Sequence, residues 1–364
     1  MIDSKQGKII DIIGKNEKVT EVIVEIANIR EKAINYNLFT GRPEIGDYVI
    51  LNTTAVELGL GTGGYHFIIA NLKGKNIKSN CEGHIMKLRY TPLQLKTMAA
   101  EEQKSPHHQV FLDFKTLNGL PVIIGSLHSM LMPIAATIKY HRPELRVTYI
   151  MTDTAALPID FSKTVALLKE KSLIDYTITL GNAFGGDFEC INIYNGLIAA
   201  KEITKCDIAV ITMGPGIVGT GTPYGFSGID QGANIDAVNT LGGRAITIPR
   251  ISFADKRHRH RGISHHTLTV LDKIAKTKCY LPLPILPKAQ GEYIKNQIIN
   301  LKINKKHYIV EMNTVNLPKI LKKYSLKVNS MGRSYSDDPS FFQACCCGAQ
   351  LSLRVLQTNL CNNK

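Results

Sequence analysis

The sequence predicts an α/β protein with a mainly parallel sheet and flanking helices, doubly wound and Rossmann-like, preceded by a small antiparallel β-barrel. Three observations support this. Five successive apolar runs in the middle of the chain each end in a cluster of glycine and small polar or charged residues. Segments with helical spacing separate these runs, and the first 75 residues consist of short alternating runs with glycine-rich turns. Apolar β-branched runs that alternate with helical segments are typical of βαβ units around a buried parallel sheet.

The N-terminal runs predict five short strands, and the turns GKNEK, GRPEIG and GLGTGG separate several of them. Glycine corners between alternating strands are typical of an SH3-like or OB-like barrel. Few aromatic residues are placed to stack on bases, so we expect an accessory structural role for this barrel. The predicted strands are GKIIDIIG, VTEVIVEIA, EKAINYNLF, GDYVILNTTAVELG and YHFIIANL.

The chain is expected to divide into a barrel over residues 1–75, a linker over 76–118 and an α/β domain over 119–364. Within the linker, Thr91-Pro92-Leu93-Gln94 provides an N-cap, a proline at the first helical position and a glutamine two positions later. This pattern predicts a helix from there to about Gln103.

The predicted sheet places its functional clusters at one edge. In an open parallel sheet, ligands bind beyond the carboxyl ends of the strands, so the five clusters are expected to form one site. The five runs begin at Pro121, Val147, Tyr176, Ile208 and Ala245, and two further strands are predicted from Cys279 and His307. Helices are predicted over residues 130–140, 162–172, 188–205, 228–241 and 267–276, with a last helix from Pro339 to about Leu356.

Composition bounds the function classes. The formal charge of +14 arises largely from lysines scattered through polar stretches, which disfavours a nucleic-acid partner without excluding one. No apolar stretch reaches the roughly 18 residues of a membrane span, and the N-terminus lacks a signal-peptide pattern. We therefore expect a cytoplasmic location, no membrane partner and reduced cysteines. The run Cys345–Cys347 is expected to pack in a helix rather than to bind a metal.

A glycine-rich loop follows the fourth run of the predicted sheet. In MGPGIVGTGTPYGFSG, glycines would let backbone N–H groups approach an anion closely. The spacing matches neither a Walker A loop nor G-x-G-x-x-G. We expect an anionic substrate to contact Gly214, Gly216, Gly219 and Thr220.

The segment SFADKRHRHRGISHHT is the most charged short stretch of the chain. If it is extended, its arginines share one face and two histidines the other. Arginine binds phosphate and carboxylate bidentately, and two further histidines at a helix start suit acid/base chemistry near pH 7. A basic surface loop and a metal site are the alternatives, the latter with Asp153, Asp187 or Asp255 as the carboxylate. The expected binding residues are Arg250, Arg257, His258, Arg259, His260 and Arg261; the acid/base pair is His265 and His266, and the metal ligands would be His258, His260 and His265.

Polar residues at the other strand ends complete the expected site. Ser126 and His128 follow the first run of the sheet, and His128 is expected to face the cleft. Asp153 and Asp187 are carboxylates at strand ends that could orient histidines. Arg333 and the aspartates at 337–338 precede the last predicted helix, and capping of that helix is their favoured role. The alternative is that this segment folds back so that these side chains join the site.

The chain resembles an uncharacterised bacterial family, the domain-of-unknown-function family 3866. The resemblance rests on GSLHS, MTDTAALP, TLGNAFGGD, MGPGIVGTGT with GFSG, and RISFADKRHRHRGISHHT, and it spans nearly the whole chain. It implies that these segments belong together and transfers no reaction.

The best-supported expectation is a cytosolic enzyme, a transferase or hydrolase, that acts on a phosphorylated or other anionic small metabolite such as a nucleotide or sugar phosphate. In this hypothesis the glycine loop and the arginines hold the anion, His128, His265 and His266 act as acid/base groups, and Asp153, Asp187 and Asp255 orient them. One alternative is a metal-dependent hydrolase that uses the same His/Asp cluster, so a divalent metal remains an open cofactor. The other is a non-catalytic protein that binds nucleic acid or a protein partner.

Overall fold

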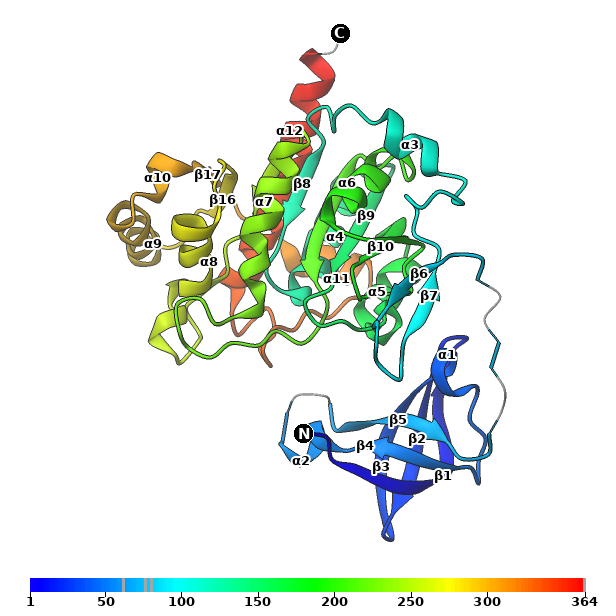
Figure 1. Ribbon diagram of the computed structural model, residues 1–364. Coiled ribbons are helices and arrows are strands. Elements are labelled where there is room, and N and C mark those ends of the chain that lie inside the picture. The colour runs from blue at the N-terminus through cyan, green and yellow to red at the C-terminus, as the bar shows by residue number, and fades with distance from the viewer. Residues whose placement is uncertain (61–62, 75–76, 79–80, 363–364) are drawn as a thin grey trace. The chain divides into compact units, whose positions relative to one another are not determined.

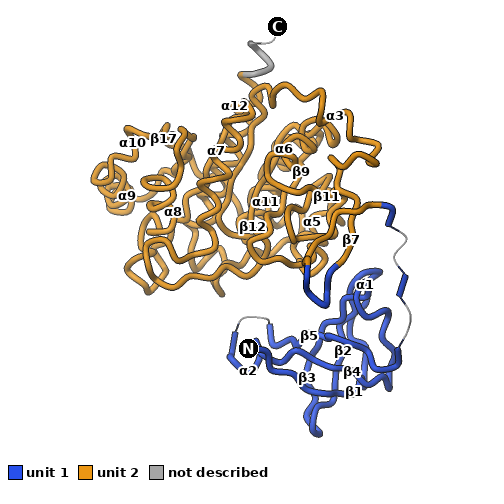
Figure 2. The backbone as a smooth tube through the Cα atoms, viewed as in Figure 1, with its two compact units in different colours: residues 1–82, 90–94 blue, residues 83–89, 95–364 orange. Residues whose placement is uncertain are grey.

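The computed structural model describes residues 1–60, 63–74, 77–78 and 81–362 of the chain. Its contacts divide it into two compact units (Figure 2): unit 1 holds residues 1–82 and 90–94, and unit 2 holds residues 83–89 and 95–364. Residues 76 and 79–80, at the start of the predicted linker, lie outside the described residues.

Unit 1 contains a closed five-stranded barrel, as predicted. Its strands are β1 (Ser4–Lys15), β2 (Val19–Ile26), β3 (Ile29–Tyr36), β4 (Tyr48–Asn52) and β5 (Tyr65–Asn71), in the order β1-β2-β3-β5-β4. All pairs are antiparallel except β3 with β5. Alternate residues such as Ile9, Val22 and Leu51 fill the barrel core. Two single-turn helices, α1 (Asn37–Thr40) and α2 (Thr54–Glu57), complete this unit.

Unit 2 is built on an eight-stranded, entirely parallel sheet, which confirms the predicted fold class. The strand order is β11-β10-β9-β12-β8-β13-β16-β17. Every residue of β8, β9 and β12 is buried, as expected for central strands covered on both faces. The strands are β8 (Pro121–Ile124), β9 (Val147–Thr152), β10 (Tyr176–Leu180), β11 (Phe188–Cys190), β12 (Ile208–Met213), β13 (Arg244–Thr247), β16 (Tyr280–Pro284) and β17 (Tyr308–Met312).

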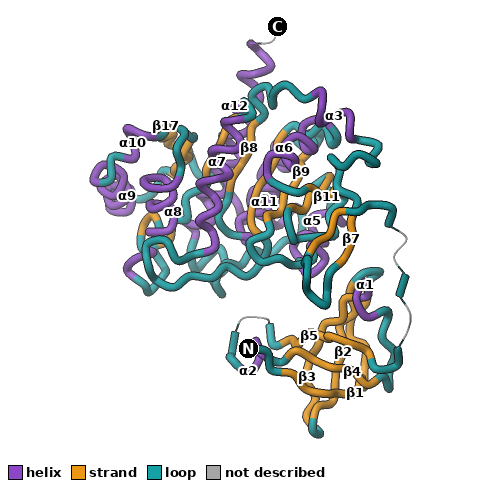
Figure 3. Tube along the Cα trace, in the orientation of Figure 1, coloured by secondary structure: helices purple, strands orange, loops and turns teal. Residues whose placement is uncertain are grey.

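Helices cover both faces of this sheet (Figures 1 and 3). On one face α6 (Ile193–Glu202) packs against α7 (Asp230–Thr240), and on the other α4 (Leu131–His141) packs against α5 (Lys163–Glu170), α11 (Leu317–Lys323) and α12 (Pro339–Asn362). Cys345–Cys347 are buried within α12, in agreement with the packing role predicted for them. The remaining helices of unit 2 are α3 (His108–Asp113), α8 (His265–Thr269), α9 (Lys288–Asn300) and α10 (Ile303–Lys306).

The predicted helix from Thr91 to Gln103 is wrong. Leu95–Thr97 form strand β7, which pairs with β6 (Ile85–Lys87) in an antiparallel hairpin. Leu95 and Thr97 are more buried than Lys96 between them, so strand pairing overrides the local capping signal. The predicted helix over 188–205 is likewise too long, because its first three residues form the edge strand β11 and the helix begins after Asn192, whose side chain caps it.

The strand order determines where loops meet. The chain runs from β8 outward through β9, β10 and β11, returns to β12 beside β8, and continues through β13 on the other side of β8. The connections after the adjacent strands β8 and β12 therefore run to opposite sides of the sheet, and such a divergence at the carboxyl edge is where ligands bind in open parallel sheets. Among the described residues, no helix combines the length and the apolar character needed to cross a membrane.

Candidate functional site

A cavity of about 200 Å³ lies where the chain segments after β12 and β13 meet. One wall comes from the glycine loop after β12, and the other from the charged segment after β13. Met331, from a loop near the C-terminus, also contributes. The lining residues are Ile217, Val218, Gly219, Gly221, Arg250, Arg257, Arg259, His260, His266 and Met331.

The charged segment is a short hairpin rather than the extended stretch considered from its sequence. Strands β14 (Ile251–Ser252) and β15 (Gly262–Ile263) pair antiparallel, and the residues 258–260 between them form a 3₁₀ turn. Arg257, Arg259 and Arg261 therefore do not share one face. Arg257 pairs with Asp255, the Arg259 guanidinium carbon lies 3.8 Å from where a Cβ on Gly221 would be, and Arg261 lies over the Tyr293 ring at 5.9 Å.

Asp255 organises the arginines. Its buried carboxylate accepts hydrogen bonds from Arg257 Nε at 3.0 Å and Arg250 Nη2 at 3.2 Å, and Arg333 Nη2 lies 3.5 Å away. Hydrogen bonds from Arg257 hold the pKa of Asp255 well below its usual range. Burial lowers the pKa of Arg250 to about 10, so its guanidinium still carries a charge at neutral pH. Asp255 thus positions these arginines, and it does not act as a free base.

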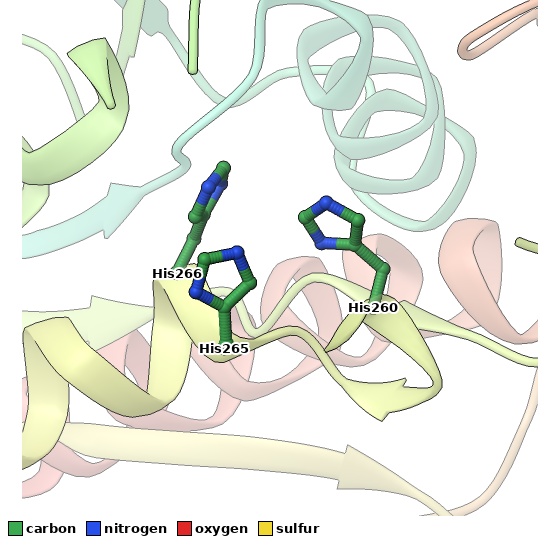
Figure 4. Close-up of side chains that lie close together, drawn as sticks. All are labelled: His260, His265 and His266. Atoms are coloured by element: carbon green, nitrogen blue, oxygen red, sulfur yellow. The ribbon is translucent and has the colours of Figure 1, made fainter. Parts of the chain in front are cut away.

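Three imidazoles cluster beside this ion-pair network (Figure 4). His265 and His266 begin α8, and His260 ends the preceding 3₁₀ turn. One nitrogen of each ring lies within 4.8 Å of a nitrogen of each of the other two. Ser264 connects the cluster, because its Oγ lies 2.7 Å from His260 Nδ1 and accepts a hydrogen bond from the backbone N–H of His266. Phe226 stacks on the His266 ring at 4.0 Å between centroids.

The three histidines are neutral at pH 7. Burial, with the nearby arginines, lowers the pKa of His260 to about 3 and that of His265 below its usual value. Burial and the other two imidazoles lower the pKa of His266 to about 3. Burial is the largest cause of these low pKa values, and neighbouring charged groups add to it. Neutral imidazoles keep a nitrogen lone pair available for binding, whereas the low pKa values of His260 and His266 lie too far from neutral pH for efficient acid/base catalysis.

The glycine loop approaches the histidines closely. A Cβ at Gly219 would lie 3.4 Å from His266 Cε1, so a larger side chain there would fill the cavity. Gly221 has φ of +81°, a conformation that favours glycine. Thr220 is used within the loop, because its N–H donates to Gly225 O at 2.7 Å and its hydroxyl contacts Thr222.

Several expected site residues do not line this cavity in the described part of the chain: Ser126, His128, Asp153, Asp187, Gly214, Gly216, Thr220, Asp255, His258, Arg261 and His265. His258 is exposed and lies outside the imidazole cluster. The metal set expected from His258, His260, His265 and a carboxylate is thus replaced by His260, His265 and His266, while Asp255 is occupied by arginines.

His128 is a fully partnered imidazole at the carboxyl end of β8. Its Nδ1 lies 3.2 Å from Tyr149 Oη, and its Nε2 lies 2.7 Å from Ser162 Oγ. Burial lowers the pKa of His128 to about 4. Nearby, Ser126 is buried against Gly228 of the loop after β12.

The two remaining aspartates lie at opposite edges of the sheet. Asp153 follows β9 at the carboxyl edge, where it accepts a hydrogen bond from Asn182 N. Asp187 instead binds Thr177 at the amino end of β10 and forms an ion pair with Lys169. Burial alone would raise the pKa of Asp187, but hydrogen bonds from Lys169 and Thr177 outweigh it and lower that pKa. Asp187 is therefore on the wrong edge to join the cavity.

Residues from two further segments contribute to the site without having been predicted to do so. Arg333, for which capping was favoured, reaches Asp255 and lies 3.3 Å from Asp338. Met331, Ile217 and Val218 line the cavity as apolar residues that no polar signature would reveal. The sequence feature that could have indicated Arg333 is an arginine shortly before two aspartates in a glycine- and serine-containing segment.

Comparison with known proteins adds a family and no activity. A family model described as "Protein of unknown function (DUF3866)" matches residues 32–349, which include both walls of the cavity. No curated protein matches the chain.

Proposed function

The chain belongs to the DUF3866 family, and we propose that it is an enzyme whose arginine- and histidine-lined cavity binds a small anionic metabolite. The observation that carries the proposal is the composition of the cavity wall: Arg250, Arg257 and Arg259 lie together with two neutral histidines and a glycine loop. Such convergent polar groups in a concave site, at the carboxyl edge of a parallel sheet, are typical of ligand-binding sites.

Local charge favours an anion. Four arginines, at positions 250, 257, 259 and 333, surround or adjoin the cavity, whereas the carboxylates they contact among the described residues are those of Asp255 and Asp338. Of these arginines, Arg250 is buried, where electrostatic attraction is stronger than in water, whereas Arg257 and Arg259 are exposed. Phosphate and carboxylate groups match the guanidinium geometry.

Arg259 is the arginine best placed to meet the ligand. Arg250 and Arg257 already donate to Asp255, and this contact holds them in position. Arg259 is exposed and lines the cavity, and its guanidinium lies near Gly221 of the glycine loop. Among the described residues no hydrogen bond or ion pair engages the Arg259 guanidinium, so its N–H groups are available for an incoming anion.

The apolar part of the wall indicates the rest of the ligand. Ile217, Val218 and Met331 line the cavity, and Val218 and Met331 are 67% and 45% exposed. They offer apolar surface beside the arginines. The proposed substrate is therefore a small metabolite with a phosphate or carboxylate group and a less polar body, such as a sugar phosphate or a nucleotide.

Replacement of Arg259 by alanine tests this function. We expect the variant to bind inorganic phosphate and pyrophosphate about 30-fold more weakly, because loss of a charge-assisted contact costs about 2 kcal/mol. Isothermal titration calorimetry at low ionic strength measures the change. Arg244→Ala is the matched control, because Arg244 is exposed at the amino end of β13. Equal weakening in both variants, or no binding of either anion by the wild-type protein, would contradict the proposal.

A further inference from the structure

The imidazole cluster has a feature that anion binding does not explain. His265 Nε2 and His266 Nδ1 are buried and have no hydrogen-bond partner, and His266 is only 7% exposed. A buried nitrogen without a partner is costly, and such atoms in a native structure call for a ligand or a chemical role. Both atoms belong to rings whose nitrogens already lie close together.

The rings face a common space. In Figure 4 the three side chains extend to the same side of the segment that carries them. Ring centroids are 5.1 Å apart for His260 and His265, 5.0 Å for His260 and His266, and 4.3 Å for His265 and His266. A tetrahedral metal with bonds of about 2.0–2.1 Å needs ligand nitrogens about 3.3 Å apart, so small ring rotations bring nitrogens from within 4.8 Å to that spacing.

Neighbouring residues orient the rings as they do around protein metal sites. When His260 Nδ1 donates its hydrogen bond to Ser264 Oγ, at 2.7 Å, Nε2 carries the lone pair. An outer partner of this kind fixes the tautomer of a metal-binding histidine. The stack of Phe226 on His266 holds the second ring in place. Burial also keeps the rings neutral, which is the form that binds metal.

We propose that His260, His265 and His266 bind one divalent transition-metal ion, and that an open position on this ion takes the anion held by the arginines. The metal site is argued from the histidine cluster alone, whereas the binding of the anion to the metal rests on the function proposed above. Three neutral nitrogen ligands suit zinc and other first-row ions that accept imidazole, and three protein ligands leave a position free for a substrate or water.

The arginines are compatible with this ion only if an anion is present. Guanidinium groups near the cluster repel a bare cation, and no carboxylate belongs to the three-residue cluster found among the described residues. An anion that bridges the metal and Arg259 offsets both positive charges. Zinc and phosphate should therefore each increase the affinity of the other, as reciprocal coupling requires.

Metal titration of the full-length, untagged protein tests the site. After chelator treatment and dialysis, we expect wild-type protein to bind one Zn²⁺ per chain in calorimetry, and to bind Co²⁺ with the visible absorption of a low-coordinate site. His266→Phe keeps the aromatic stack and removes a ligand, so zinc affinity should fall by more than about 100-fold. His265→Gln should produce a similar loss and serves as a second variant if His266→Phe fails to fold.

His258→Gln is the matched control, because His258 is an exposed histidine of the same segment outside the cluster. Unchanged zinc affinity is expected for it, with folding checked by circular dichroism. Zinc binding that is equal in wild type, His266→Phe and His265→Gln, or lost equally in His258→Gln, would overturn the metal site.

The two proposals fail separately. If zinc binds at the cluster and no phosphate binds, the metal-site proposal holds and the anion-site proposal is contradicted. If phosphate binding depends on Arg259 and the wild type binds no zinc, the anion-site proposal holds and the metal-site proposal is contradicted. Zinc and phosphate that bind with no mutual effect would contradict the bridging anion alone.

Discussion

The buried ion pair of Lys87 and Glu189 and the imidazoles of His260, His265 and His266 lie in the same unit, but their polar atoms are partnered very differently. Lys87 Nζ donates to Glu189 Oε2 and Ala183 O, both at 2.5 Å. Glu189 also accepts from Thr179 Oγ1 and Gly185 N, each at 2.6 Å. The histidine cluster, in contrast, leaves two buried nitrogens without a partner.

This difference distinguishes buried polar groups that stabilise the fold from buried polar groups that are available to a ligand. Burial raises the pKa of Glu189, and the pairing with Lys87 partly offsets that effect, so the ion pair serves to satisfy groups that the fold has already desolvated. Neither Lys87 nor Glu189 is among the described residues that line the cavity beside the imidazoles. Buried atoms that are unpaired and border a cavity indicate a ligand, whereas buried atoms that are fully paired indicate packing.

The largest expected effect comes from breaking the satisfied pair. Lys87→Met leaves Glu189 buried without its cation, so we expect the free energy of unfolding to fall by about 3–5 kcal/mol in urea denaturation. Replacing both residues, in Lys87→Met/Glu189→Met, should recover part of this loss. The exposed pair offers a control, since Lys169→Met should cost less than about 1 kcal/mol. Equal losses in Lys87→Met and Lys169→Met would break the comparison.

A smaller effect is expected at His128, a partly buried imidazole whose two nitrogens both have partners. Its pKa is about 4 in the fold against an ordinary value of 6.5, so its contribution is complete above about pH 6.5 and is lost as pH falls to 4. The loss is on the order of 3 kcal/mol. His128→Gln lacks this titration, so the stability gap between wild type and variant should narrow across that window. Urea denaturation at several pH values measures it, and a constant gap would contradict the assignment.

The smallest effect on stability is expected at the unpaired cluster. Because His266 has a buried nitrogen with no partner, His266→Phe should leave the metal-free protein equally stable or raise its unfolding free energy by about 1 kcal/mol. The same variant should bind zinc poorly, as stated above. Thermal unfolding without metal checks this prediction. A loss of more than about 2 kcal/mol would place His266 with the packed, structural polar groups.

Local pattern predicted the framework well. The runs that became β8, β9 and β12 are continuous and β-branched, and burial on both faces follows directly from that composition. The alternation of the first 75 residues likewise predicted the barrel. The pattern failed at Thr91–Gln103, where the pairing of β7 with β6 outweighs a good helix-start signal.

The site was predicted in part. The glycine loop and the segment from Arg250 to His266 do form one cavity, because parallel strands place their carboxyl ends at one edge. Which histidines meet was not predictable from spacing alone. A 3₁₀ turn at 258–260 directs His260 inward and leaves His258 exposed, so the cluster contains His266 instead.

The amino-acid sequence alone determined the barrel strands, the central strands of the parallel sheet and the presence of arginines and histidines after them, because these depend on composition and on periodicity along the chain. Tertiary structure alone decided that Arg333 reaches Asp255, that Asp187 lies at the far edge, and that two imidazole nitrogens remain unpaired. Such outcomes depend on contacts between residues distant in the chain, and on the water that packing excludes from them.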